Sequence, residues 1–226
     1  RDRRDLHAFP TRRSSDLGVL PAEVVIIGGG TVGINAAKMA VGLGARVTVV
    51  DINVNRLAYL DDVFGGRVST LVFNEFNVAQ MVKRADLLVG AVLVTGAKAP
   101  KTVSEAMVKT MKKGSVIVDV AIDQGGSIET VDRITTHDNP CYERFGVVHY
   151  SVANMPGAVP RTSTLALTGA TLPYLRRLAE RGVDAAMRED PVLLAGLNTR
   201  KGFLTNKAVA DSLGLPYTDA AAAMKA

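Results

Sequence analysis

Three glycines, Gly28, Gly30 and Gly33, have the G-x-G-x-x-G spacing of a loop that binds the pyrophosphate of a dinucleotide. The first permits a tight turn, the second lets the backbone approach the phosphates, and the third lets a helix pack closely on the loop. That helix begins at Thr31 and Val32, where unpaired N–H groups attract negative charge. The spacing alone also fits a glycine-rich turn in another kind of α/β protein. The residues around the glycines must therefore distinguish that turn from a dinucleotide-binding loop.

An acid at a suitable distance favours the nucleotide interpretation. Asp51 lies 18 residues after Gly33 and ends an apolar segment, where a carboxylate can accept hydrogen bonds from an adenosine ribose. The same charge repels a 2′-phosphate, so NAD is predicted as the cofactor rather than NADP. Arg56 is a candidate phosphate contact, although a solvated charge on a helix surface explains it equally well.

The elements around these residues form a β-α-β unit. Apolar, mostly β-branched residues predict a strand at 24–27, a helix follows at 31–43, and a second strand is predicted at 46–50. The alternation continues, with helices expected at 54–63, 78–84 and 104–111 and strands at 67–73, 86–94, 115–120 and 147–151. Such alternation predicts an α/β fold with a doubly wound parallel sheet of the Rossmann type.

Ligands bind such sheets beyond the carboxyl ends of the strands. Four loops are expected there: the glycine loop and the segments 95–100, 122–126 and 152–157, all rich in glycine, proline or small polar residues. Asp123 follows an apolar strand at this edge. It is either a catalytic carboxylate or a cap for the turn that comes next.

The pattern changes after the last predicted strand. Residues 164–181 predict an amphipathic helix with one stripe along its length, made of Leu165, Thr168, Leu172, Leu175 and Leu178. Shorter helices are expected at 184–188, 191–195 and 206–212, with a turn at 198–202. We therefore predict an NAD-binding domain at 18–158. The helical C-terminal segment at 159–226 is expected to belong to the catalytic domain and to pack on a missing N-terminal part of it.

The first 17 residues do not fit the rest of the chain. They show no periodicity and carry five Arg and three Asp, which is +2 of the formal net charge of +5. A basic tail is the ordinary interpretation, but FPTRRSSDL at 9–17 is also the translation of a common sequencing adapter. We therefore expect a non-native segment fused to a truncated reading frame, and the basic balance does not indicate anionic partners.

Composition excludes several classes of protein. A hydrophobic fraction of 47% with only 5% aromatics predicts a large core of Val, Ala, Leu and Ile, which suits buried parallel strands. Basic residues are scattered, so nucleic acid is not an expected partner, and no apolar run is long enough to span a membrane. The single cysteine, Cys141, fits a cytoplasmic protein. No metal site is predicted.

Five segments together resemble the C-terminal part of bacterial alanine dehydrogenase, over nearly all of residues 18–226. They read GGGTVGINAAKMAVGLGARVTVVDIN (28–53), AVLVTGAKAPKTVS (91–104), VDVAIDQGG (118–126), SVANMPGAVPRTST (151–164) and TNKAVADSLGLPYT (205–218). The related α-subunit of proton-translocating transhydrogenase shares the fold and a similar glycine loop. Two departures from the commoner family pattern are Thr95, where proline is expected, and Gly29, where alanine is usual.

The resemblance implies oxidative deamination of L-alanine to pyruvate and ammonium, with NAD as the hydride acceptor. It puts Asp123 beside the nicotinamide and the substrate, where a carboxylate orients the water or ammonia that adds to an imine, or relays a proton. It also implies that Asn154 bonds the carboxamide and Met155 covers a ring face, although a plain turn is the alternative for both. The remaining implied cofactor contacts are Val92, Leu93, Ile122, Val152 and Ala153.

In that family an upstream half supplies a Lys and a His that hold and activate the substrate, so the isolated chain is expected to be inactive. His137 and His149 do not match that catalytic position, and Lys98 and Lys101 are expected to be loop charges. The resemblance also implies a homo-oligomer, a hexamer. The alternatives are an NAD-binding subunit of the transhydrogenase type, which passes hydride to a partner, and a stand-alone NAD-binding module.

Overall fold

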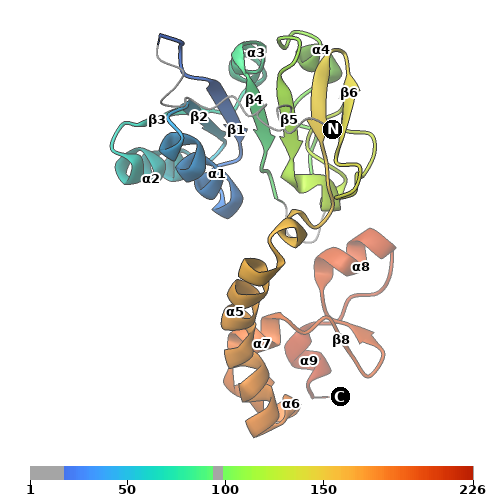
Figure 1. Ribbon diagram of the computed structural model, residues 1–226. Coiled ribbons are helices and arrows are strands. Elements are labelled where there is room, and N and C mark those ends of the chain that lie inside the picture. The colour runs from blue at the N-terminus through green and yellow to red at the C-terminus, as the bar shows by residue number, and fades with distance from the viewer. Residues whose placement is uncertain (1–17, 94–98, 226) are drawn as a thin grey trace. The chain divides into compact units, whose positions relative to one another are not determined.

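The computed structural model of the chain describes residues 18–93 and 99–225 (Figure 1). The predictions for residues 1–17, Thr95 and Lys98 lie outside the described residues. Contacts divide the described chain into two units between Met155 and Pro156. This division falls three residues before the predicted one, at the start of the short 3-10 helix η3 (Met155–Ala158).

The described residues of the first unit form a seven-stranded sheet with the order β3-β2-β1-β4-β5-β7-β6. The strands are β1 (Glu23–Ile27), β2 (Arg46–Asp51), β3 (Val68–Val72), β4 (Leu87–Gly90), β5 (Val116–Asp119), β6 (Cys141–Arg144) and β7 (Val147–Tyr150). Neighbouring strands are parallel, apart from the antiparallel pair β6 and β7. The predicted Rossmann-type fold is confirmed, and its strand order reverses between β1 and β4.

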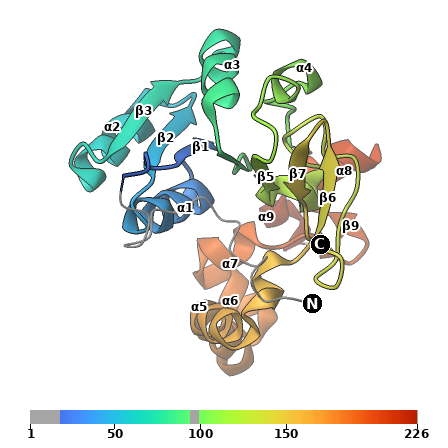
Figure 2. The ribbon, with the colours of Figure 1, turned by 45° about the horizontal axis from the view of Figure 1, so that its top comes forward.

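Helices cover both faces of this sheet (Figures 1 and 2). The helices α1 (Thr31–Gly42) and α2 (Val54–Phe64) cover one face, and α3 (Glu75–Arg84) and α4 (Glu105–Val108) cover the other. Val24 and Ile26 of β1 pack beneath α1 and α2, whereas Val25 and Ile27 pack beneath α3 and α4. Because successive side chains of a strand point to opposite faces, a strand that is covered on both sides is apolar throughout.

The sheet departs from the prediction at one edge and at two strand ends, and the strand predicted at 86–94 ends at Gly90. The expected sheet was wholly parallel, but β6 pairs antiparallel with β7 through a turn in which Phe145 and Gly146 have φ of 59° and 77°. An edge strand of this kind needs little apolar character, and the sequence CYER offers little. The strand predicted at 115–120 ends at Asp119, and residues 120–124 form the 3-10 helix η2 (Val120–Gln124).

The second unit is mainly helical. Its helices are α5 (Pro160–Arg181), α6 (Val183–Glu189), α7 (Pro191–Ala195), α8 (Lys207–Leu213) and α9 (Ala220–Ala223), and its hairpin consists of β8 (Thr199–Arg200) and β9 (Phe203–Leu204). The hairpin forms where a turn is predicted. Every residue of α5 is exposed or half-buried, including Leu165, Leu172 and Leu175. In the part of the chain that the structure describes, the helices are too short or too polar to cross a membrane.

Candidate functional site

The carboxyl ends of four neighbouring strands organise the candidate site. The strand register pairs Ile27 of β1 with Gly90 of β4, and Gly90 with Asp119 of β5. The last residue of β7, Tyr150, pairs with Val118 of β5. The segments that follow β1, β4, β5 and β7 therefore leave the sheet at the same edge, as the sequence predicts.

The glycine loop has the tight and open positions that its spacing predicts. Gly28 has a φ of 104°, and a Cβ there would lie 2.7 Å from the carbonyl oxygen of Ala91. A Cβ at Gly33 would lie 1.9 Å from the carbonyl oxygen of Gly28, so α1 packs directly on the loop. At Gly30, by contrast, no described heavy atom other than those of its chain neighbours lies within 4 Å of the position a Cβ would take. The loop is thus fixed by Gly28 and Gly33 and open at Gly30.

The start of α1 suits an anionic ligand. Gly30 precedes the helix, and among the described residues no side chain caps it. Thr31 and Val32 are exposed, and the described first turn contains no acid. The first N–H groups of a helix carry a partial positive charge, so this end of α1 is available to a phosphate.

Asp51 and Arg56 hold the glycine loop from the side of β2. One Asp51 oxygen accepts the N–H of Gly29 at 2.6 Å, and the other accepts the N–H of Asn53 at 2.8 Å. The Arg56 guanidinium donates to the carbonyl oxygens of Gly29 and Gly30. Arg56 is therefore not an isolated surface charge, and its guanidinium, which has five N–H donors, keeps others for a phosphate.

Apolar side chains from two strand ends lie at the same edge. Val92 follows β4, is half-buried and packs on the core beneath α3 and α4. The next residue, Leu93, is 68% exposed. Ile122 of η2 is buried in that same core. Leu93 is thus the most accessible apolar residue of the three for an adenosine group.

Asp123 lies in the 3-10 helix η2 and is exposed. Within the part of the chain that the structure describes, its carboxylate makes no hydrogen bond or ion pair. The turn is instead capped by Asp119, which accepts the N–H of Ala121 at 3.1 Å. Asp119, not Asp123, therefore caps this turn. The Asp123 carboxylate remains available to a ligand.

Asp119 is a structural residue that the sequence analysis missed. Its fully buried carboxylate accepts the N–H groups of Ser127 and Ile128 at 2.7 and 3.0 Å and the Ser127 hydroxyl at 3.2 Å. Burial raises the pKa of Asp119, and the donated hydrogen bonds oppose that change. The sequence did contain a signal for this role. Asp119 ends an apolar strand, and a Gly-Gly-Ser sequence whose N–H groups need acceptors follows the next turn.

The segment after β7 presents the remaining predicted contacts. Val152 is buried, Ala153 and Met155 are half-buried, and Asn154 is exposed with a φ of 54°. Asparagine tolerates this left-handed conformation better than most residues. The Nε2 atom of His137 donates to the carbonyl oxygen of Asn154 at 3.2 Å. His137 thus supports the loop that carries Asn154.

His149 is a core residue. Its ring is fully buried and stacks on Tyr142 at a centroid distance of 5.1 Å. Nδ1 donates to the carbonyl oxygen of Val147 at 2.9 Å, so in the neutral ring Nε2 accepts the Thr130 hydroxyl at 2.8 Å. Burial lowers the pKa of His149. This placement agrees with a structural role.

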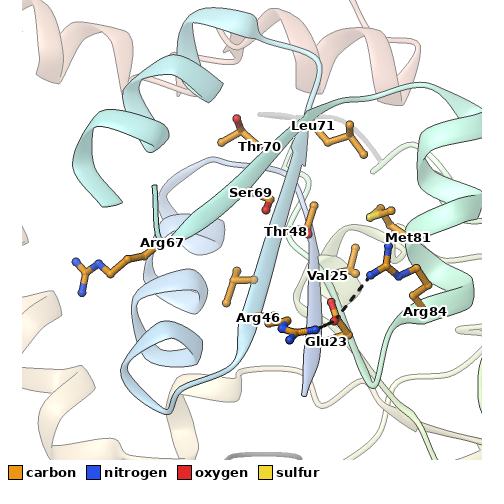
Figure 3. A pocket seen from close by; sticks show the side chains of 11 residues that line it. Glu23, Val25, Arg46, Thr48, Arg67, Ser69, Thr70, Leu71, Met81 and Arg84 are labelled. Carbon is orange, nitrogen blue, oxygen red and sulfur yellow. Dashed lines mark hydrogen bonds and ion pairs between the residues drawn. The ribbon is translucent and has the colours of Figure 1, made fainter. Parts of the chain in front are cut away.

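A hollow of about 410 Å³ lies on the α3 side of β1, β2 and β3 (Figure 3). Figure 3 shows Glu23 between two arginines; its carboxylate lies 3.3 Å from Arg46 and 3.9 Å from Arg84. Glu23 and Arg46 are the first residues of their strands. These charges therefore lie at the opposite edge of the sheet from the glycine loop and are separate from the candidate cofactor site.

Residues 14–207 match the family described as "Alanine dehydrogenase/PNT, C-terminal domain". The chain belongs to the alanine dehydrogenase/PNT family. Two relatives named alanine dehydrogenase, from Methanococcus maripaludis and Bacillus subtilis, are 67% and 60% identical over 207 and 208 residues. Each comparison covers 92% of this chain but only 56% and 55% of the relative. The chain thus spans about half the length of the curated relatives it matches.

Solved structures of the alanine dehydrogenase/PNT family agree with this assignment. An L-alanine dehydrogenase superposes with a TM-score of 0.80 at 53% identity, over 87% of this chain and 54% of that chain. A transhydrogenase from Sinorhizobium meliloti superposes with a TM-score of 0.65 at 26% identity, over 79% of this chain and 50% of that chain. The resemblance drawn from the sequence is confirmed, and the transhydrogenase is the more distant match. The roles of the individual site residues stay predictions.

Proposed function

We propose that this chain is the NAD-binding half of an alanine dehydrogenase, which converts L-alanine, NAD and water to pyruvate, ammonium, NADH and a proton. The observation that carries the proposal is the exposed carboxylate of Asp123, at the same sheet edge as the glycine loop. The names of the two relatives support alanine as the substrate. The isolated chain lacks about half the length of those relatives, so the proposed activity is that of the longer protein.

The residues at the sheet edge fit NAD. The open space at Gly30 and the start of α1 suit the pyrophosphate, and Asp51 offers carboxylate oxygens to the ribose. The remaining proposed contacts are Gly28, Thr31, Val32, Gly33, Arg56, Val92, Leu93, Ile122, Val152, Ala153, Asn154 and Met155. When bound, NAD supplies the acceptor for the hydride of alanine.

Asp123 acts on the substrate in this proposal. Loss of hydride from the Cα of alanine with a neutral amino group leaves an iminium ion, and water must add to its carbon before ammonia can leave and take up a proton. The Asp123 carboxylate orients that water, or relays a proton to or from it. Its freedom from hydrogen bonds within the described part of the chain leaves both carboxylate oxygens available for this role.

The second unit is proposed to belong to the substrate domain of the longer protein. Three leucines of α5, namely Leu165, Leu172 and Leu175, are 62%, 59% and 63% exposed. An apolar helix surface of this kind stabilises a protein only when another element covers it. With the family assignment we also propose a homo-hexamer in the cytoplasm; the single cysteine is compatible with a reducing compartment.

The test joins residues 18–226 to the part of the M. maripaludis relative that precedes its matched segment. NADH formation by this joined protein should require L-alanine, and calorimetry should detect binding of NAD. Binding of NAD without any alanine-dependent reduction would favour a hydride-transfer subunit of the transhydrogenase type or a stand-alone binding module.

A further inference from the structure

The side chain of Lys101 reaches from the segment after β4 to the segment after β5. Its ammonium donates to the carbonyl oxygens of Gly125 at 2.8 Å and Gly126 at 2.9 Å, and lies 3.4 Å from that of Ile128. A lysine ammonium has three N–H donors, so these three carbonyl groups use all of them. Among the described residues, no carboxylate pairs with Lys101.

Two successive glycines give this turn its shape. Gly125 and Gly126 have φ of 87° and 73°, a region that glycine enters freely and most other residues avoid. Their N–H groups bond the carbonyl oxygens of Ile122 and Ala121 at 2.9 and 3.0 Å, and so close the 3-10 helix that carries Asp123. Because glycine is permissive in conformation, contacts from elsewhere in the chain must fix this end of the turn.

Lys101 belongs to a segment that runs beside the turn. The N–H of Ala99 donates to the carbonyl oxygen of Gln124 at 3.0 Å, and the N–H of Thr102 donates to that of Ser127 at 2.8 Å. Lys101 lies between these two backbone contacts, and its ammonium reaches the two glycine carbonyls that they leave between them. The side chain thus completes the connection between the two segments.

We propose that Lys101 is a positioning residue for Asp123: its ammonium fixes the carbonyl groups of Gly125 and Gly126 and thereby holds the 3-10 helix that presents the Asp123 carboxylate. The inference rests on the proposed function, in which Asp123 acts on the substrate. Since its three donors are already engaged, Lys101 itself contacts neither substrate nor cofactor. Its role goes beyond that of a solvated loop charge.

Steady-state kinetics of the joined protein test this proposal. Lys101→Met keeps the length of the side chain but removes its donors, and a misplaced carboxylate should lower kcat by about tenfold or more. The KM for NAD should change by less than about threefold, since Asp51 and the glycine loop follow other strands. Lys101→Arg, which keeps a cation and several donors, should restore kcat to within about threefold of the unsubstituted protein.

The matched control is Lys112→Met. The Lys112 ammonium pairs with the Asp86 carboxylate at 2.7 Å. Asp86 directly precedes β4 and Lys112 precedes β5, so this pair lies at the amino ends of the two strands, away from Asp123. Its substitution should leave kcat within about twofold of the unsubstituted value. An unchanged kcat in Lys101→Met, or an equal loss in Lys112→Met, would overturn the positioning role. Lys101→Gln, which keeps a donor without the charge, serves if the methionine variant does not fold.

Amide hydrogen exchange of the full 226-residue chain separates this inference from the proposed function. Exchange at Gly125 and Gly126 should be at least about tenfold faster in Lys101→Met than in the unsubstituted chain, and unchanged in Lys112→Met. Equal exchange rates at Gly125 and Gly126 in all three proteins would contradict the proposal that Lys101 holds this turn. If the unsubstituted joined protein has no alanine-dependent activity, the proposed function fails, whereas the exchange comparison still decides whether Lys101 holds the turn.

Discussion

At the scale of single residues, the exposed carboxylate of Asp123 carries the largest expected effect on activity. Asp123→Ala in the joined protein removes a group that orients water or relays a proton, so kcat should fall by about 10²- to 10⁴-fold. The Kd of NAD, measured by calorimetry, should change by less than about threefold, because the loop that holds the pyrophosphate follows another strand.

A second exposed aspartate provides the control for this substitution. Asp62 lies on α2, away from the row of strand ends, and Asp62→Ala should leave kcat unchanged. Full activity in Asp123→Ala would show that the carboxylate has no part in the reaction, whatever the cofactor affinity.

Asp51 should select between the two nicotinamide cofactors through its charge. Asp51→Asn keeps an oxygen that can accept the N–H of Gly29 but removes the negative charge that repels a 2′-phosphate. A charge interaction at a few ångströms near a protein surface is worth about 1–4 kcal/mol, so the preference for NAD over NADP should fall by about tenfold or more. Calorimetric titrations with both cofactors measure the ratio of the Kd of NADP to the Kd of NAD. The control is Asp61→Asn, on the exposed side of α2, which should keep the ratio of the unsubstituted protein. The same ratio in both variants would contradict the assignment of Asp51.

The residues found from the sequence and those that were missed differ in the range of their contacts. The glycines and Asp51 follow from spacing within one β-α-β unit, and the structure places them accordingly. Asp119 and Lys101 instead act on residues 8 and 24 positions away, at Ser127 and Gly125. Short-range patterns describe one element at a time, so they do not reveal where a side chain meets a distant loop.

At the scale of elements, apolar runs of residues predicted the central strands, whereas the polar edge strand was not predicted. The strands β1, β2 and β4 are covered on both faces, so their sequences are apolar and were predicted. The edge strand β6 has exposed and half-buried positions, and its sequence resembles a loop. The observed start of α3 differs from the predicted one because a capping side chain sets it. The helix begins at Glu75 and not at 78, since the Asn74 side chain accepts the N–H of Asn77.

The buried imidazole of β7 makes the stability of the first unit depend on pH. Burial lowers the pKa of His149 in the folded chain, whereas in the unfolded chain it is about 6.5. Above that value neither state is protonated at this ring, and below it the unfolded state binds a proton that the folded state disfavours. The free energy of unfolding, measured with urea, should therefore fall as the pH is lowered from about 7 to about 5.

Two variants assign this slope to His149. His149→Gln should lower stability at every pH but flatten the dependence between about pH 7 and 5, because the titrating group is gone. His137→Gln, which removes an exposed ring, should keep the dependence of the unsubstituted chain. An equal slope in both variants would mean that another group is responsible.

At the scale of the whole molecule, the exposed leucines of α5 predict a covering element in the longer protein. The double variant Leu172→Ser, Leu175→Ser should lower the Tm of the joined protein by about 4 °C or more, as expected for the loss of buried apolar surface. In the 226-residue chain the same change should leave Tm nearly unaltered, because both side chains are exposed there.

Met39 on α1 is 67% exposed and offers the matched control. Met39→Ser should change the Tm of both proteins equally little. A double leucine variant with the same small effect in both proteins would contradict the proposal that α5 packs against the substrate domain.

The most direct test of the whole account is the initial rate of NADH formation by the joined protein, with and without L-alanine. We predict a rate that requires both NAD and L-alanine, saturates with each, and is absent from the M. maripaludis part alone. A folded joined protein that binds NAD but forms no NADH when L-alanine is added would contradict the assignment of this chain to an alanine dehydrogenase.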